Sequence, residues 1–339
     1  MVPPDTAPLA AALQPSDPAF QPSDAEQRGT DAARRGTDAG TPVTHQPEPT
    51  TPGSITSSAV LSQAPSENFP VASRVLPAAV RRHLMALYGF ARLTDDIGDE
   101  AVADRPALLD WLEAELGRAA LGRATHPLMT ALTPTLVELD LPLEPFEALI
   151  DANRQDQVVR RYQRFEDLVG YCMLSAAPVG RLVLAILGRS TPERTALADD
   201  VCVGLQVVEH LQDVAEDLAQ DRIYLPLDDL RTLGCDEADL GAPEAGPALR
   251  RVVALECRRA RHLLRSGAPL AASLPLRERV AVAGFTAGGL AALDAIERAR
   301  FDVLGHAPRP SRLGFARRLV GVLAATTRRH RTHGRAPRP

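Results

Sequence analysis

The sequence predicts an all-α fold, a single large helical bundle, and three observations support that prediction. Apolar residues recur at helical spacing in long segments between about residue 78 and residue 329. Aromatic residues make up only 4% of the chain, so aliphatic residues, alanine and leucine above all, must fill the core, and both are strong helix formers. No convincing alternation with a period of two, the pattern of a half-buried strand, is found.

Proline and glycine mark the ends of the expected helices. Breaks fall, for example, at Leu141-Pro142-Leu143-Glu144-Pro145 and at Gly241-Ala242-Pro243. Pro178 is expected to kink the helix in which it lies. The segments expected to be helical are 78–100, 106–120, 126–138, 144–158, 165–188, 193–219, 244–266, 275–304 and 312–329.

Composition divides the 339 residues into three parts. Residues 1–65 are rich in small residues, proline and aspartate and poor in large apolar groups, so we expect a disordered tail. Residues 66–305 carry the helical pattern and are expected to form one domain. Residues 306–339 are expected to form a basic C-terminal helix and tail.

Charge and cysteine usage exclude several classes of function. The formal net charge of -5 argues against nucleic acid as a partner. The four cysteines form no C-x-x-C pair and have no histidine at zinc spacing, so neither a disulfide framework nor a zinc site is indicated. No apolar run reaches about 18 residues, and the N-terminus lacks the pattern of a secretory signal. A cytoplasmic location is therefore expected.

The segment 83–100 carries the first candidate site. On a helix with 100° per residue, Asp95 and Asp99 lie on one face, and the other faces are largely apolar. A helix that is apolar nearly all round is buried, so both carboxylates should point into the protein. Such a pair opposes the helix by about 0.2–0.5 kcal/mol even when exposed, and its burial costs more. A bound cation is therefore expected, and Mg²⁺ suits carboxylates that are shared with substrate phosphates.

Two arginines, Arg81 and Arg92, lie beside this acidic face and are positioned to hold phosphate oxygens. The alternative interpretation is a solvated acidic helix end that pairs with local arginines. The apolar surroundings favour the metal site over this alternative.

The segment 204–217 repeats the arrangement. Gln206, His210, Asp213 and Asp217 form one stripe, and apolar residues cover most of the remaining surface. Taken alone, the segment fits an ordinary surface helix, and a single histidine is more often a satisfied polar residue than a catalyst. However, two aspartate pairs on facing helices can hold a diphosphate through several Mg²⁺ ions. The metal charge then neutralises the leaving diphosphate.

Together these motifs resemble the squalene/phytoene synthase family over residues 66 to about 300. The resemblance rests on Tyr88-Gly89-Phe90-Ala91-Arg92 leading into Asp95–Glu100, on Tyr171-Cys172 with Ser175–Gly180, and on Gln206–Asp217 followed by Arg222-Ile223-Tyr224-Leu225-Pro226. It implies an isoprenoid-synthase helical bundle with a central apolar cavity. It also implies that the two aspartate motifs face each other across the cavity and bind Mg²⁺-diphosphate.

Three details resemble the bacterial hydroxysqualene synthases of the hopanoid pathway. They are the segment 66–73, the run 178–181, and Gln212-Asp213, where most of the family has Arg-Asp. This resemblance implies a carbon–oxygen lyase that converts presqualene diphosphate to hydroxysqualene beside other hopanoid-pathway enzymes. The alternatives are a presqualene diphosphate, dehydrosqualene or phytoene synthase, and a non-catalytic homologue that serves as a binding or assembly protein.

Three positions depart from the family pattern. Glu209 stands where the family usually has asparagine, Ala177 where hydroxysqualene synthases often have asparagine, and Asp221 where a glycine precedes the arginine. These departures bear on the exact product and leave the four motif aspartates intact.

The motifs and the resemblance give each candidate residue an expected role. The expected metal ligands are Asp95, Asp99, Asp213 and Asp217, with Asp96 and Glu216 as helpers. The expected substrate-binding residues are Arg92, Arg222, Asn68, Arg81, Tyr88, Gln206 and Tyr224. Tyr171, with Tyr88, is expected either to stabilise a carbocation by ring-face attraction worth roughly 0.5–2 kcal/mol or to pack in the core.

The last helical stretch, 312–329, combines large apolar residues with several arginines. A basic amphipathic helix can lie on an anionic membrane surface. Peripheral contact with the inner face of the cell membrane is therefore one interpretation. The other is a terminal helix with a solvated basic tail.

Overall fold

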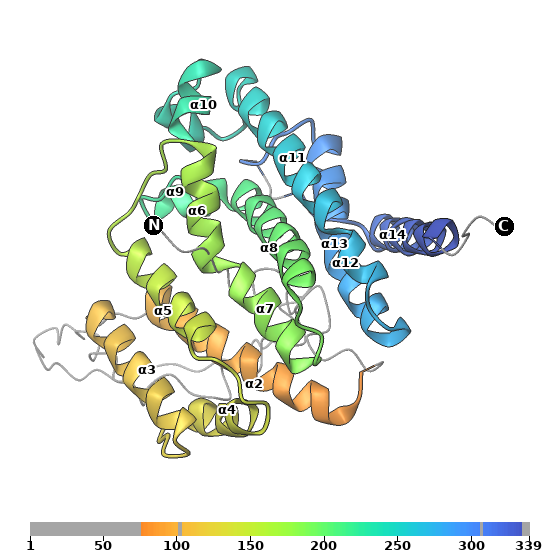
Figure 1. The fold of residues 1–339 in the computed structure, drawn as a ribbon. Helices are drawn as coiled ribbons and strands as arrows, with labels where there is room; N and C mark the ends of the chain where they lie inside the picture. Colours follow the sequence, from red (N-terminus) through yellow and green to blue (C-terminus); the bar gives the residue numbers. More distant parts are fainter. Residues whose placement is uncertain (1–75, 101–103, 306–307, 334–339) are drawn as a thin grey trace, which may run out of the picture.

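The computed structural model describes residues 76–100, 104–305 and 308–333, and within these ranges the chain is all-α (Figure 1). The described elements include no strand, only one isolated bridge between Arg161 and Ile223. The predicted fold class is thereby confirmed. The expected tail 1–65 and the candidate residue Asn68 lie outside the described residues.

Most helices fall within the ranges that the sequence predicts. The first half contains α2 (Ala78–Asp95), the π turn η2 (Asp96–Glu100), α3 (Arg105–Ala120), α4 (Pro127–Glu138), α5 (Glu144–Asp156), α6 (Phe165–Ser175) and α7 (Ala177–Ile186). The second half contains α8 (Pro192–Gln212), α9 (Val214–Ala219), α10 (Leu227–Thr232), the 3₁₀ turn η3 (Glu237–Gly241), α11 (Pro247–Gly267), α12 (Pro269–Ala272), α13 (Leu276–Arg298) and α14 (Arg312–His333). Of these elements, α10, η3 and α12 are additional ones that the sequence does not predict.

Three of the expected helices are interrupted. The first changes from α to π geometry at Asp96. The second breaks at Ala176 (φ -130°), two residues before Pro178, which confirms a proline-linked kink. The third breaks at Asp213 (φ -105°). Two of these interruptions fall within the acidic motifs, and π turns are frequent at functional sites.

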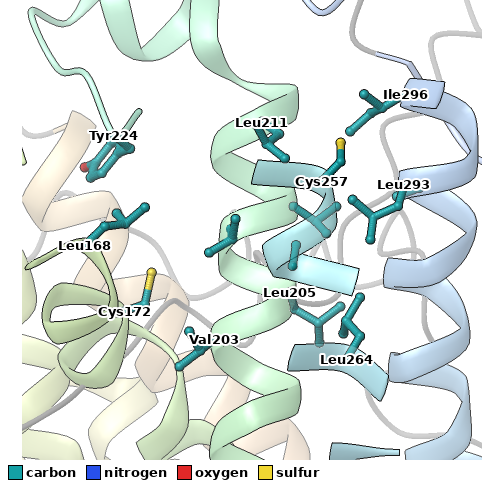
Figure 2. Packing of buried hydrophobic residues seen from close by; sticks show 14 of the residues in the cluster. Leu168, Cys172, Val203, Leu205, Leu211, Tyr224, Cys257, Leu264, Leu293 and Ile296 are labelled. Carbon is teal, nitrogen blue, oxygen red and sulfur yellow. The ribbon is translucent and has the colours of Figure 1, made fainter. Parts of the chain in front are cut away.

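Two apolar cores lie on either side of α7. One joins α2, α3, α4 and α5, where Phe90 and Phe146 meet edge to face with ring centroids 5.1 Å apart. The other surrounds α8, and Figure 2 shows Leu205 of α8 close to Leu264 of α11. α13 also approaches closely, because a Cβ added at Gly289 would lie 2.8 Å from both leucine side chains. The acidic motifs lie on α2 and α8, so each core anchors one of them.

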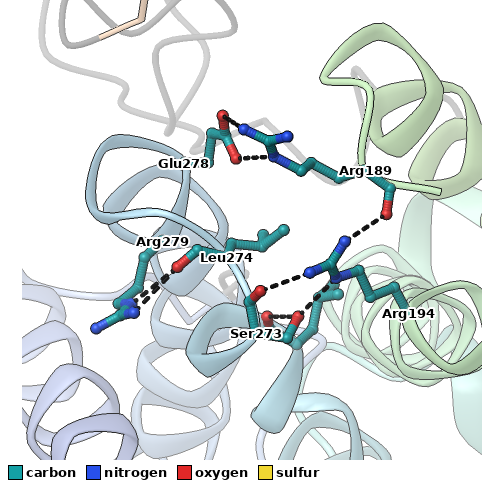
Figure 3. A network of polar contacts seen from close by, with 7 residues as sticks. Arg189, Arg194, Ser273, Leu274, Glu278 and Arg279 are labelled. Atoms are coloured by element: carbon teal, nitrogen blue, oxygen red, sulfur yellow. Dashed lines mark hydrogen bonds and ion pairs between the residues drawn. The ribbon is translucent and has the colours of Figure 1, made fainter. Parts of the chain in front are cut away.

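A polar network fixes the turn between α7 and α8 to the turn between α12 and α13 (Figure 3). Arg189 forms an ion pair with Glu278 at 2.8 Å. Arg194 donates to the carbonyl oxygen of Ser273 at 2.8 Å and to its hydroxyl oxygen at 3.1 Å. These contacts hold α8 and α13 together at the end distant from the second acidic motif.

Two helical stretches of the described residues, Phe165–Ile186 and Leu276–Arg298, are long and apolar enough to cross a membrane by length and composition. The apolar windows of these stretches are 61% and 72% buried in the bundle. A mostly buried core helix meets the same criterion, so we interpret both as core elements.

Glu115 joins α3 to the start of α4 through a fully buried carboxylate. It accepts hydrogen bonds from the backbone N–H groups of Thr125 and His126, from the Thr125 hydroxyl and from Arg118. Burial by itself raises the pKa of Glu115. The hydrogen bonds from Thr125, Arg118 and the His126 backbone outweigh burial and lower the pKa to about 2.

Replacing this carboxylate should therefore destabilise the fold in a pH-dependent way. We expect Glu115→Gln to lower the free energy of unfolding by about 1–3 kcal/mol at pH 7. The folded pKa lies below the unfolded one, so the contribution is complete above about pH 4.5 and is lost as the pH falls toward 2. Urea unfolding at pH 7 and at pH 3 measures the difference.

The matched control is Glu113→Gln on the same helix, which removes only a half-exposed ion pair with Arg154. That change should cost less than about 1 kcal/mol. Equal losses in the two variants, or a Glu115→Gln loss that does not shrink at low pH, would contradict the assigned role.

Candidate active site

The two acidic motifs meet at a buried arginine. Arg222, which follows α9 and is 6% exposed, donates to Oδ1 of Asp99 in the π turn at 2.6 Å. Asp99 is also close enough to Asp217 to raise the pKa of that carboxyl. The structure therefore brings Asp99, Asp217 and Arg222 together from segments about 120 residues apart, as the prediction of facing motifs requires.

Three carboxyl groups of this site, those of Asp95, Asp213 and Asp217, share an unfavourable environment. The Asp99 side chain, in contrast, is exposed, so the expectation that it points into the protein is wrong. Burial raises the pKa of Asp95 well above its ordinary value, and the neighbouring Asp99 raises it further. Burial and then Asp213 do the same to Asp217. Burial and the nearby Glu216 raise the pKa of Asp213 to about 7. Carboxylates in such a place need positive charge to ionise.

Helix α5 holds the first motif in position. A Cβ at Gly98 would lie 1.9 Å from Oδ1 of Asn153, so only glycine allows the π turn to lie this close to α5. Asn153 also hydrogen-bonds the Asp95 carboxyl and lowers its pKa. Gln157 donates to the carbonyl oxygen of Gly98 at 3.1 Å. α5 thus fixes both the backbone and a carboxylate of the motif.

The donor set fits a hard cation that keeps part of its hydration shell. Among the described residues, no group of three or more His, Cys, Asp or Glu side chains is arranged to hold a metal ion alone. The site instead offers carboxylate oxygens from two helices, and Oδ2 of Asp217 is buried with no hydrogen-bond partner in the part of the chain that the structure describes. Mg²⁺ suits such a site, because it binds one or two carboxylates together with substrate phosphates and water.

Asp96 and Glu216 lie at the edge of this carboxylate cluster. Asp96 forms an ion pair with Arg92 at 2.8 Å, one helical turn earlier. Glu216 is exposed and acts on Asp213 through its charge. Arg92 is therefore beside the first motif, as predicted, with a carboxylate already paired to it.

A second buried carboxylate, Asp156 at the end of α5, was not predicted from the sequence. It accepts hydrogen bonds from the hydroxyls of Tyr171 at 2.5 Å and Tyr224 at 3.0 Å. Burial raises its pKa to about 6, although the Tyr171 hydrogen bond and the Arg222 charge oppose that rise. Asp156 thus links the predicted residues Tyr171 and Tyr224 to Arg222 and to the acidic cluster.

His210 completes this aromatic group without carrying a charge. Its ring stacks on Tyr224 with centroids 3.8 Å apart, and its ring nitrogen lies 3.3 Å from the Gln206 amide. Burial and the nearby Arg222 lower the pKa of His210 to about 3. A neutral, stacked histidine agrees with the interpretation of His210 as a satisfied polar residue. Gln206 lies beside it with its Oε1 buried and without a partner.

Two predicted substrate-binding residues lie away from the cluster. Arg81 donates to the carbonyl oxygen of Leu76 at 2.8 Å, near the start of α2. It precedes Asp95 by fourteen residues, which corresponds to roughly 21 Å along a helix. Tyr88 is fully buried in the core that joins α2 to α5, which favours the packing role given as its alternative.

The residues after α13 also reach the second motif. Gln212 donates to the carbonyl oxygen of Pro308 at 2.9 Å, and the charge of Arg309 lowers the pKa of Asp213. Sequence reasoning missed Arg309, because it lies 96 positions after Asp213 and in no motif. It places a positive charge near the position where Gln212 replaces the arginine found in most of the family.

Asp221, one of the three departures, has left-handed backbone geometry with φ 59°. Glycine adopts this conformation without strain, whereas aspartate does so at a cost. Arg161 donates to the carbonyl oxygen of Asp221 at 2.6 Å and to its carboxylate at 3.0 Å. These bonds hold the turn that leads into Arg222.

An apolar pocket lies between α7, α8, α12 and α13. Small residues open it on the side of the α6–α7 break. Its lining consists of Ala176, Val179, Gly180, Val183, Leu184, Ala198, Val201, Cys202, Leu205, Leu270, Val282 and Phe285. Gly180 does not widen the pocket, because a Cβ there would lie 2.8 Å from Sγ of Cys202 and 3.3 Å from Cβ of Ala198, so this glycine lets α7 pack closely against α8.

Comparison with known proteins identifies the family. The family model described as squalene/phytoene synthase matches residues 62–316. A hydroxysqualene synthase of Rhodopseudomonas palustris is 39% identical over 61% of this chain and 71% of its own length. The structure of a squalene synthase, HpnC, of Alicyclobacillus acidocaldarius is similar with a TM-score of 0.67 and 44% identity, over 71% of this chain and 92% of that one.

A dehydrosqualene synthase structure shares the fold, with a TM-score of 0.72 at 22% identity over 80% of this chain and 95% of that one. The family match covers most of the chain and includes both acidic motifs. The chain belongs to the squalene/phytoene synthase family, the head-to-head prenyl synthases of isoprenoid biosynthesis, which typically use Mg²⁺.

Proposed function

We propose that this enzyme converts presqualene diphosphate to hydroxysqualene with the help of Mg²⁺. The observation that carries the proposal is the convergence of Asp99, Asp217 and Arg222 from the two acidic motifs. The similarity to a hydroxysqualene synthase supports this particular reaction within the family. Gln212 and the unusual run 178–181 favour the same assignment.

The reaction begins when the carbon–oxygen bond of the substrate breaks and the diphosphate leaves with the electron pair. Arg222 is positioned to contact the diphosphate, together with Arg92 and the newly found Arg309. Asp95, Asp99, Asp213 and Asp217 would hold Mg²⁺, which when bound neutralises charge on the leaving diphosphate. Because the raised pKa values of these carboxyl groups reflect burial and mutual repulsion, the cation would also keep them ionised.

The remaining cyclopropylcarbinyl cation rearranges in apolar surroundings, and water then adds through its oxygen and loses a proton. Apolar surroundings would exclude other water until that step. Tyr171 is buried, and its hydroxyl is fixed by Asp156, so its ring is held in one orientation. A ring fixed in this way can stabilise a nearby cation by about 0.5–2 kcal/mol.

Other reactions within the family remain the main alternatives. Formation of squalene requires a hydride donor, and the sequence carries no dinucleotide-binding fingerprint, although squalene synthases of this family lack it too, so the product assay must decide. Purified protein with Mg²⁺ should convert presqualene diphosphate to hydroxysqualene, identified by mass spectrometry. Farnesyl and geranylgeranyl diphosphate are tested in parallel. Turnover of farnesyl diphosphate alone would reject the product assignment, and no turnover of any substrate would favour a binding or assembly role.

Loss of a motif carboxylate should abolish turnover without unfolding the protein. We expect Asp95→Asn and Asp213→Asn each to lower kcat by about 100-fold or more, because the leaving diphosphate loses electrostatic stabilisation. Both variants should be at least as stable as the parent in Mg²⁺-free buffer, since they remove a buried like charge. Asp151→Asn, on the exposed face of α5, is the control. Full turnover by either motif variant would exclude the metal role.

Asp156→Asn should separate activity from stability. We expect kcat to fall by about 10- to 100-fold, because Tyr171 and Tyr224 lose their fixed acceptor. Asp156 has a folded pKa of about 6, above its ordinary value of 3.8. It therefore favours the folded state below about pH 4 and loses that contribution as the pH rises through 6.

In Mg²⁺-free buffer the variant should consequently be more stable than the parent by about 1–3 kcal/mol at pH 8 and equal to it at pH 4. Thermal unfolding at both pH values measures this. Glu256→Gln changes another buried carboxyl, with a pKa raised by burial to about 7, that pairs with Arg259 on α11. Glu256→Gln is expected to leave kcat unchanged. A similar fall in kcat in Glu256→Gln and in Asp156→Asn would point to a general effect on folding.

A further inference from the structure

The C-terminal part of the chain has a charge opposite to that of the rest. Residues 303–339 contain nine arginines and no aspartate or glutamate, whereas the whole chain has a formal net charge of -5. Such an asymmetry indicates a surface with a negatively charged partner. Six of the nine arginines lie in α14, at the edge of the bundle beside α12 and α13 (Figure 1).

The inner face of α14 fixes the helix to the bundle. Phe315, Leu319 and Val322 pack against the core around α8, and Val322 is 8% exposed. Arg318 forms an ion pair with Asp294 of α13 at 2.5 Å. The helix is therefore held in one orientation, and its other face is presented outward.

The outer face of α14 combines exposed apolar and cationic side chains. Leu313 is 80% exposed and Val320 is 67% exposed, two turns apart on the same side of the helix. Arg312 and Arg317 are exposed beside them, and no described residue pairs with either arginine. Exposing two large apolar side chains next to two cations suits a partner that is both apolar and anionic better than it suits water.

A groove adjoins this outer face, and Arg317 lies at their shared edge. Its floor is mostly apolar, and Arg265 at the end of α11 adds a second exposed cation that no described residue pairs with. The groove is lined by Arg265, Ala268, Pro269, Ala272, Leu290, Arg317, Arg318, Gly321, Val322 and Ala325. An apolar floor with an arginine rim complements a molecule that has an anionic head and an acyl chain.

We propose that the outer face of α14 and this groove bind the surface of an anionic lipid bilayer. Leu313 and Val320 enter the boundary between headgroups and acyl chains, and Arg265, Arg312 and Arg317 contact the lipid phosphates. The charge of this surface complements anionic phospholipid, and neither α14 nor the described groove lining contains an acidic residue that would repel such a lipid. The proposal goes beyond the proposed function, although a water-insoluble C30 product would have reason to leave at a bilayer.

The test is co-sedimentation of the full chain with vesicles of phosphatidylglycerol and phosphatidylcholine, without substrate or Mg²⁺. We expect binding to vesicles that contain phosphatidylglycerol and little binding to pure phosphatidylcholine. Affinity should fall as salt rises. Each arginine near the surface contributes about fivefold in affinity, so Arg312→Gln/Arg317→Gln should bind about 25-fold more weakly. Leu313→Ser/Val320→Ser should also bind more weakly, with its salt dependence retained.

The matched control is Arg82→Gln/Arg123→Gln, which removes two exposed arginines that no described residue pairs with, outside α14 and the groove. It should bind like the parent. Equal weakening in both double arginine variants, equal binding to both lipids, or no binding at all would overturn the proposal. Because binding is measured without substrate or Mg²⁺, failure of the proposed function leaves this result unaffected.

Discussion

Holding several carboxylates together inside an apolar bundle is the constraint on which the active site depends. Burial raises the pKa values of three carboxyl groups, Asp95, Asp213 and Asp217, and an acidic neighbour raises each of them further. One buried cation, Arg222, joins the two motifs through Asp99. The site is therefore only partly compensated by the protein, and a Mg²⁺-diphosphate would supply the charge that is still missing.

The scaffold around the site is arranged to maintain this incomplete balance. α5 contacts the π turn through Asn153 and Gln157, and its last residue, Asp156, orients two tyrosines. The core around α8 and the polar network at its far end fix the second motif. The same helices that provide stability therefore determine where the charges lie, so substitutions at Asn153 and Asp156 of α5 should affect both stability and chemistry.

Much of the fold and the main acidic residues could be predicted from the sequence, because period and spacing carry that information. The all-α class, most helix ranges and the kink near Pro178 follow from local patterns, whereas the facing of the two motifs was expected only from the family resemblance. Asp156, Asn153 and Arg309 could not be found in this way, since their roles arise from contacts between distant segments. Arg81 was predicted wrongly to be near the site, because it lies on the same helix as Asp95 but near the other end of it.

The π turn at Asp96–Glu100 has a consequence for how this site tolerates insertions and deletions. A π turn accommodates an additional residue within a helix, so removing one residue from this segment would allow regular α geometry to continue. The residues that follow would then rotate by about 100° about the axis, and Asp99 would no longer face Arg222. Variation in chain length should therefore be excluded from these five residues.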